Sequence, residues 1–286
     1  MINRESIRLF AGVVKLVAFF LLYQYLFVVL GRLGSFVAFR MHVSGVSYEQ
    51  FTYSPTALMS QYATMGVAVG VFLSSLAMIL HLLLFGYVKF SRNIFSEVKG
   101  SVLLLSVFFI GSMMMVFNII AAWLGLDNNM ETVHEQLLGN GFGVLSMAVL
   151  APVLEELLFR GAIQGALMRY FRSPWVGIVV ASLLFGIIHL NPVQVFYATC
   201  LGIGFGWVYY RTGSLLPAIL GHIINNSLAV CGAILFGSEM DAAATGSAAY
   251  DIRIVLVASL WMLVLVLAIN RLQPPVPRPW HDVSEN

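Results

Sequence analysis

Long apolar runs recur along the 286-residue chain and leave it few ways to fold. A membrane-spanning helix needs about 20 mainly apolar residues, and hydrocarbon tolerates only structures that satisfy their own backbone hydrogen bonds. Hydrophobic residues make up 60% of the chain and charged residues 10%, whereas soluble domains carry about 25% charged residues. The sequence therefore predicts an all-α, polytopic membrane helix bundle, that is, a multi-pass integral protein in contact with the lipid bilayer.

Eight apolar segments are candidates for membrane-spanning helices. They lie at roughly 8–31, 61–88, 101–125, 141–168, 174–190, 193–210, 214–236 and 252–271. This pattern divides the chain into four parts: the first three helices with their connectors (1–140), a core of helices four to seven (141–236), a loop with the last helix (237–272), and a proline-rich tail (273–286).

Lysine and arginine gather in every second connector, with Arg32 and Arg40 after the first helix as exceptions, and such residues set the orientation of a membrane protein. The positive-inside rule places these connectors, and both termini with them, on the cytoplasmic side. The compact bundle without large extra domains is typical of a protein of the prokaryotic plasma membrane. The net charge of +2 is too small to indicate a nucleic-acid partner.

Three charges interrupt the fourth apolar segment, in "APVLEELLFRGAIQG" (151–165). A charge at the bilayer centre costs on the order of 2.5–3.5 kcal/mol, so each of them needs an explanation. Glu156 and Arg160 are four residues apart on one helix face, which favours a buried ion pair. Glu155 is rotated from Glu156 by about 100° and has no second cation on its helix. An intramembrane carboxylate of this kind is a candidate functional group.

Two further apolar segments carry polar side chains. "SLLFGIIHLNP" contains His189, and Phe185 lies one turn before it on the same face, where it can pack against the imidazole. "PAILGHIINNS" contains His222 and Asn226, four residues apart on one face, whereas Asn225 is expected to point elsewhere. A bundle can bring these helices and the carboxylates around one water-filled cavity.

The other polar and small residues of the apolar segments are interpreted as packing groups. His81 is expected to be a satisfied core histidine, and the two cysteines are expected to be small buried residues rather than parts of a disulfide or metal site. Pairs of glycines at helical spacing permit close approach of helices in lipid. These pairs are Gly66/Gly70, Gly161/Gly165 and Gly202/Gly206.

The side chains Glu155, Glu156, His189, His222 and Asn226 form a set with hydrolytic potential. A carboxylate and a histidine can hold a water molecule and remove its proton, while a second histidine and an amide can donate hydrogen bonds to an oxyanion. One carboxylate and two histidines, here Glu155, His189 and His222, also suit a catalytic zinc with an open position. The chain lacks the short HExxH signature of zinc proteases, so the favoured interpretation requires no cofactor.

In order and spacing, these motifs resemble the CPBP family of intramembrane proteases, which includes the CaaX-processing endopeptidases and bacterial immunity-type relatives. The family pattern of EExxxR, FxxxH and HxxxN stands here as "EELLFR" (155–160), "FGIIH" (185–189) and "HIINN" (222–226). The resemblance implies that Glu155 activates water with His189, and that His222 and Asn226 stabilise the oxyanion. Glu156, Arg160 and Phe185 would support this site.

Three functions are therefore weighed. The leading one is an intramembrane endopeptidase, glutamate-dependent or metal-dependent, acting on a membrane-associated protein or peptide. The second is a non-catalytic family member that works by binding, for example as an immunity protein. The third is a proton-coupled transporter, because intramembrane Glu and His often relay protons.

Overall fold

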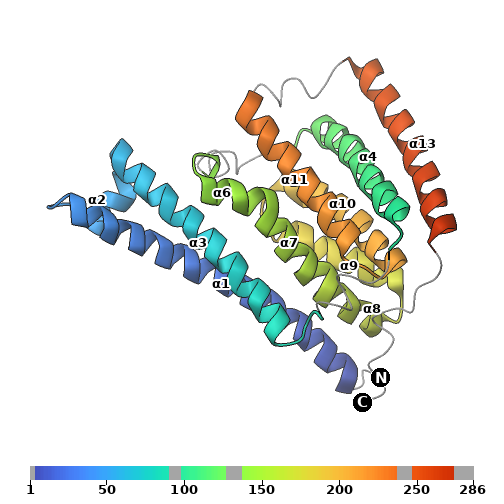
Figure 1. Ribbon diagram of the computed structural model, residues 1–286, viewed down its shortest axis with the longest axis horizontal. Helices are drawn as coiled ribbons and strands as arrows, with labels where there is room; N and C mark the ends of the chain where they lie inside the picture. The colour runs from blue at the N-terminus through green and yellow to red at the C-terminus, as the bar shows by residue number, and fades with distance from the viewer. Residues whose placement is uncertain (1–3, 90–97, 127–136, 237–246, 274–286) are drawn as a thin grey trace.

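The chain is described by a computed structural model over residues 4–89, 98–126, 137–236 and 247–273. Within these ranges all regular structure is helical, which confirms the predicted all-α fold (Figure 1). The proline-rich tail predicted at 273–286 lies outside the described residues apart from Gln273. The α-helices are α1 (Arg4–His42), α2 (Tyr48–Tyr53), α3 (Ala57–Leu84), α4 (Gly100–Leu124), α6 (Gly141–Leu145), α7 (Ala151–Glu155), α8 (Gly165–Phe171), α9 (Pro174–Ile187), α10 (Pro192–Thr212), α11 (Leu216–Phe236) and α13 (Ala248–Leu272).

Local sequence signals set several of these helix ends. The side chain of Asn140 accepts a hydrogen bond from the Gly143 N–H at 2.9 Å and caps α6, and Ser173 caps α9 in the same way from one residue before Pro174. Gly213 ends α10 in the left-handed conformation, with φ at 70°, which glycine adopts without a steric penalty.

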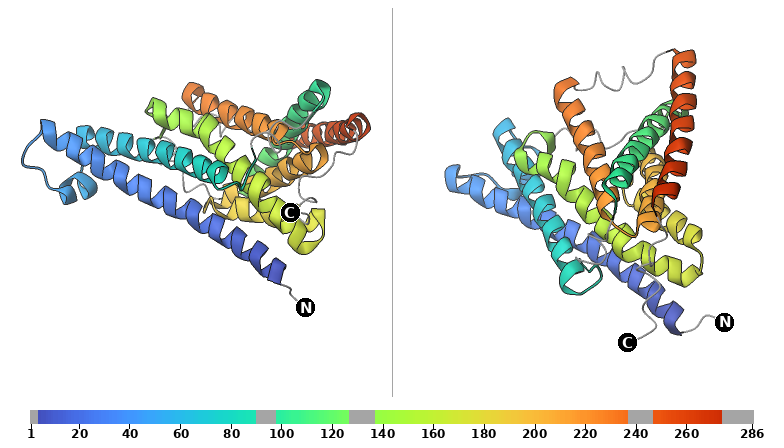
Figure 2. Two further views of the ribbon diagram at one scale, coloured as in Figure 1. Left: turned by 60° about the horizontal axis from the view of Figure 1, so that its bottom comes forward. Right: turned by 45° about the vertical axis from the view of Figure 1, so that its right-hand side comes forward.

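Helices α1 and α3 form an antiparallel pair on one flank of the molecule, with the short α2 at its tip (Figures 1 and 2). Their backbones touch where glycines meet: a Cβ added to Gly31 would collide with the Gly66 carbonyl, and one on Gly70 would collide with the backbone of Phe27. Small residues thus allow close helix packing in this pair, as the Gly66/Gly70 spacing predicts.

A continuous helix from Gly141 to Phe171 runs through the middle of the molecule. Its hydrogen bonding changes from the α pattern to the wider π pattern twice, at Ser146–Leu150 and at Glu156–Gln164. Such π segments are rare and are frequently found at functional sites. The second one begins at Glu156, inside the charged motif.

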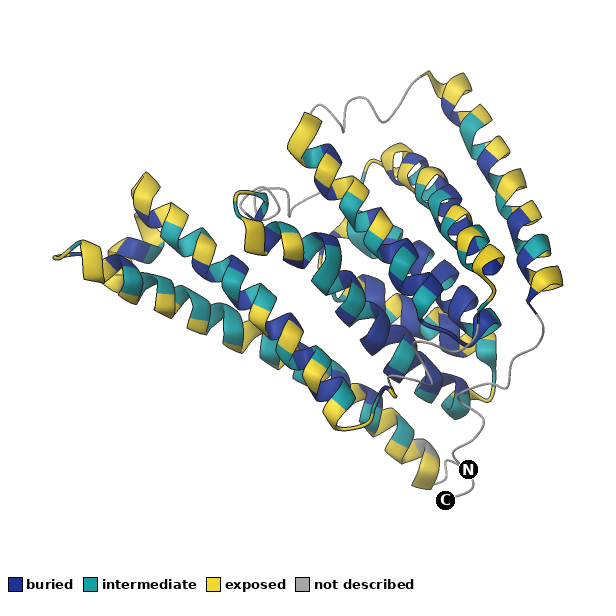
Figure 3. Ribbon diagram, viewed as in Figure 1, coloured by how far each residue is buried: buried dark blue, intermediate teal, exposed yellow. Residues whose placement is uncertain are grey.

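The remaining helices pack on the other side of this central helix. Helices α9 and α10 form a hairpin, α4 packs against α10, α11 and α13, and α11 also contacts the central helix (Figure 2). Figure 3 shows buried positions concentrated in the central helix, α9 and α10, whereas α13 exposes most of its length. The polar motifs of the sequence therefore fall in the best-buried part of the bundle.

Helices exist at all eight predicted positions, but the count of about eight spans is not confirmed. Among the described residues, six helices are long and apolar enough to cross a membrane. Helix α9 has 14 residues, or about 21 Å, which is shorter than the ~30 Å hydrocarbon core. Helix α10 has 21 residues but is less apolar than the six.

Candidate active site

The charged motif begins where α7 gives way to the second π segment. Arg160 Nη1 lies 2.8 Å from Glu156 Oε1, and the two side chains are 1% and 0% exposed, so the predicted buried ion pair is present. The guanidinium also lies between two aromatic rings, 4.4 Å from the Phe185 centroid and 5.1 Å from the Phe205 centroid. Salt bridge and cation–π contacts together offset the cost of burying this charge.

His222 of α11 joins both glutamates. Its Nδ1 lies 2.8 Å from Glu156 Oε1, and because a carboxylate only accepts, the imidazole donates this hydrogen bond. Its Nε2 lies 3.6 Å from Glu155 Oε2, an ion-pair distance when the ring is protonated. The ring stacks on Phe205, with centroids 4.8 Å apart and planes inclined by 20°.

His189 lies in the turn that follows α9, not within the helix. The predicted helix at 174–190 ends earlier, at Ile187, and the chain reverses through Leu190 with φ at 53° before α10 starts at Pro192. The Nδ1–H of His189 donates to the Phe185 carbonyl at 2.8 Å, which leaves Nε2 as an acceptor in the neutral ring. The Phe185 ring packs edge-on against His189, as the spacing predicts.

Asn226 belongs to a chain of hydrogen bonds along the cavity wall. Its Nδ2 donates to the Met147 carbonyl at 3.0 Å, and its Oδ1 accepts from Asn225 Nδ2 at 2.8 Å. Asn225 Oδ1 in turn accepts from the Tyr197 hydroxyl at 3.0 Å. Three helical segments are thereby linked: the first π segment, α10 and α11.

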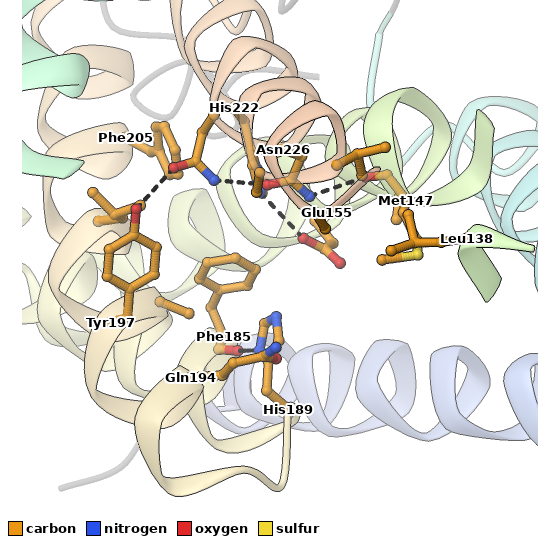
Figure 4. A pocket seen from close by; sticks show the side chains of 17 residues that line it. Leu138, Met147, Glu155, Phe185, His189, Gln194, Tyr197, Phe205, His222 and Asn226 are labelled. Carbon is orange, nitrogen blue, oxygen red and sulfur yellow. Dashed lines mark hydrogen bonds and ion pairs between the residues drawn. The ribbon is translucent and has the colours of Figure 1, made fainter. Parts of the chain in front are cut away.

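One cavity of about 410 Å³ collects most of the predicted site residues. Glu155, Phe185, His189, His222 and Asn226 line it, whereas Glu156 and Arg160 lie behind this wall and reach it through His222. In Figure 4, Glu155, His222 and Asn226 occupy one side of the cavity, and His189 faces them from the other. A cavity with mainly apolar walls and a few convergent polar side chains is the usual form of a binding or active site.

Three further polar residues that line the cavity were not predicted. Asn225 is 7% exposed and bonds Asn226 at the cavity, so the expectation that it points elsewhere is wrong. Tyr197 and Gln194 of α10 also line the cavity. The two asparagines are adjacent and could have been treated as a pair, but Tyr197 has no motif spacing that distinguishes it from an ordinary interfacial tyrosine.

A catalytic zinc would require Glu155, His189 and His222 to converge on one point, at about 2.0–2.2 Å from the metal. Within the described part of the chain, no group of three or more His, Cys, Asp and Glu side chains is arranged to hold a metal ion. His222 instead faces the two carboxylates, and His189 stands across the cavity (Figure 4). The positions of Glu155, His189 and His222 therefore do not fit a zinc site with these three ligands.

Fold and site together define a polytopic helical membrane protein with a buried carboxylate–histidine cluster open to an internal cavity. Residues 138–228 match the family model described as Type II CAAX prenyl endopeptidase Rce1-like. Over this segment the chain is similar to the CPBP family, the family that its motifs resemble.

A curated relative agrees with this assignment. YdiL of Bacillus subtilis (strain 168), a candidate membrane peptidase by its name, is 30% identical over 87 residues. The aligned segment covers 30% of this chain and 35% of YdiL, so the chain matches about a third of that relative's length. No solved structure gives a match.

Proposed function

We propose that the chain is an intramembrane endopeptidase that hydrolyses a peptide bond of a membrane-associated protein or peptide. One observation supports this most strongly: residues from three separate motifs, Glu155, His189, His222 and Asn226, line a single cavity within apolar helices. The family match and the name of the Bacillus relative favour the same class of enzyme.

In the proposed reaction, Glu155 is the general base. Its carboxylate removes a proton from a water molecule in the cavity, and the Nε2 lone pair of His189 holds that water from the other side. The oxygen of the water attacks the scissile carbonyl, and the proton on Glu155 passes to the departing amine. One water molecule is consumed, and a carboxyl group and an amine are released.

The negative charge that develops on the carbonyl oxygen requires donors. His222 lies with its Nε2 beside Glu155, where a hydrogen on that nitrogen would be a donor, and Asn226 presents the amide hydrogen that Met147 does not bind. Glu156 holds the imidazole through Nδ1, and Arg160 fixes Glu156 in turn. This division gives the two adjacent glutamates different tasks, one in proton transfer and one in support.

The proposed enzyme is glutamate-dependent, with no step assigned to a metal ion. Its substrate is a peptide segment that reaches the cavity from the membrane. A prenyl group on that segment, as named in the family description, is not part of the proposal.

Mapping new protein termini tests the proposal. Membrane proteomes are compared between cells carrying the wild type, Glu155→Gln and Glu49→Gln; the last is a matched loss of one exposed carboxylate in α2, far from the cavity. We expect fragments with the wild type and with Glu49→Gln, and none with Glu155→Gln.

Identical protein termini in all three strains would overturn the proposal that the chain is an enzyme. If the wild type still produced a phenotype, a binding role such as immunity would then hold. Proton-coupled flux in proteoliposomes that is lost with Glu155→Gln would instead support the transporter.

A further inference from the structure

The backbone carbonyl of Met147 is released from the central helix by two features that act together. In a regular α-helix this carbonyl would accept from the Ala151 N–H, but in the π segment Ala151 bonds the Ser146 carbonyl instead. In the same π pattern, the Met147 carbonyl would accept a hydrogen bond from the N–H of residue 152, five positions later. Residue 152 is proline and has no N–H, so the helix itself offers Met147 no donor.

The freed carbonyl fixes the direction of the hydrogen-bond chain beside it. A carbonyl can only accept, so the amide of Asn226 must turn its nitrogen toward Met147 and its oxygen toward Asn225. Asn225 must then donate through its nitrogen and present its own oxygen to Tyr197, whose hydroxyl donates. Every amide orientation in the chain follows from the acceptor at one end.

We infer that Asn225 and Tyr197 are positioning residues, which together with the Pro152-released carbonyl of Met147 lock the Asn226 amide with its nitrogen available to the cavity. This inference rests on the proposed function, in which Asn226 stabilises the oxyanion. Neither positioning residue touches the reacting atoms in that scheme; each acts through Asn226.

The orientation has a direct chemical consequence. One amide hydrogen of Asn226 binds Met147, and the second is the one that can reach a developing oxyanion. With the amide rotated by half a turn, its oxygen would face the Met147 carbonyl and the oxyanion would lose this donor. An asparagine alone has no preference between the two orientations, so the neighbours have to impose one.

Asn225→Asp tests the inference with almost no change in shape. Aspartate is an acceptor only, so it repels Asn226 Oδ1 and favours the wrong amide orientation. When protonated, the same carboxyl group regains one donor and one acceptor, which restores the asparagine pattern. We expect cleavage about 100-fold slower than wild type at pH 7.5, and a recovery of at least about tenfold relative to wild type at pH 5.5.

The assay uses full-length protein purified in detergent micelles, with membranes of cells carrying Glu155→Gln as the source of uncleaved substrate. The rate of appearance of the Glu155-dependent termini is measured for each variant. Position 225 faces the Tyr197 hydroxyl, and Glu155, His189 and His222 line the same cavity. These groups are common to wild type and variant, so their own titration cancels in the ratio of rates.

Tyr197→Phe removes a single donor from the far end of the chain. We expect a rate about fivefold lower, the equivalent of one ordinary hydrogen bond. Tyr25→Phe is the matched control, because it removes a hydroxyl from an exposed position of α1, and its rate should equal that of the wild type.

Pro152→Ala tests the Met147 end of the hydrogen-bond chain. It is informative even if the Asn225→Asp variant does not fold. The new N–H at residue 152 can take the Met147 carbonyl from Asn226, and replacing proline by alanine inside a helix does not weaken the helix. We expect cleavage about tenfold slower without a lower unfolding temperature. A purely structural role for proline predicts no loss of rate.

The outcomes separate this inference from the proposed function. Absence of Glu155-dependent termini with the wild type means that the function itself fails. Termini that depend on Glu155 but form at wild-type rates with Asn225→Asp and Pro152→Ala overturn the inference alone. A slow Asn225→Asp variant whose defect is the same at both pH values also overturns it.

Discussion

Two buried histidines lie in apolar helices of this bundle, and their surroundings have little in common. His81 of α3 bonds the Tyr23 hydroxyl at 3.0 Å and packs among the rings of Phe19, Tyr23, Phe85 and Tyr87. His222 of α11 instead contacts two carboxylates and faces the cavity. Burial of a histidine therefore does not by itself indicate function. The groups that contact its ring, carboxylates or aromatic side chains, distinguish the two cases.

The helices around each histidine differ in the same sense. Helices α1 and α3 pack backbone to backbone through glycines, with uncharged hydrogen bonds such as Ser74 to Gln24 at 2.9 Å. In the core, the glycines of α10 make room for polar side chains: Gly202 lies against Arg160, and Gly206 against Gln164. In the first region small residues bring two backbones together beside uncharged polar contacts, and in the second they make room for a buried charged network.

Loss of Arg160 should have the largest effect of the changes considered. Arg160→Ala leaves Glu156 buried without its guanidinium partner and empties the space between two aromatic rings. Removing one partner of a buried pair costs about 3–5 kcal/mol of unfolding free energy. Thermal unfolding in detergent, followed by tryptophan fluorescence, should show a markedly lower midpoint, and cleavage should be lost with it.

Arg160→Lys is the matched control. Lysine keeps the charge beside Glu156 but lacks the planar group that stacks between the rings, so its midpoint should lie between those of Arg160→Ala and the wild type. An Arg160→Ala protein that unfolds at the wild-type temperature would show that the ion pair contributes nothing to this core.

His222→Phe should have the next largest effect, confined mainly to activity. The aromatic ring can still stack on Phe205, but the donors toward Glu156 and Glu155 are gone. Loss of one donor to an oxyanion lowers rates by about 100- to 1000-fold, and we expect that loss in the rate at which Glu155-dependent termini form. A variant that retains more than a tenth of the wild-type rate would remove His222 from the reaction.

Much of this core was predictable from spacing alone. The four-residue separation of Glu156 and Arg160 predicted their ion pair, and that of Phe185 and His189 predicted their ring contact. Hydropathy predicted the helix positions, because apolar composition decides what lies in lipid. These features depend on neighbours within one helix or on composition, both of which are local properties of the chain.

The rest depends on contacts between distant segments. Helix α9 was predicted three residues too long, because the turn at Leu190 has no glycine to mark it. Tyr197 reaches Asn225 across 28 residues, and Asn226 reaches Met147 across 79. Neither π segment follows a hydropathy pattern, although Pro152 marks the end of the first.

His81→Phe should have the smallest effect and completes the comparison with His222→Phe. The substitution removes the hydrogen bond to Tyr23, but it also removes Nε2, which is buried without a hydrogen-bond partner among the described residues. These two contributions oppose each other, and phenylalanine suits a pocket of aromatic rings. We expect a change in unfolding free energy within about 1 kcal/mol and wild-type cleavage rates, measured by the same two assays. Loss of cleavage at an unchanged unfolding temperature would give the α1–α3 pair a part in the reaction, and the contrast between the two histidines would no longer separate packing from catalysis.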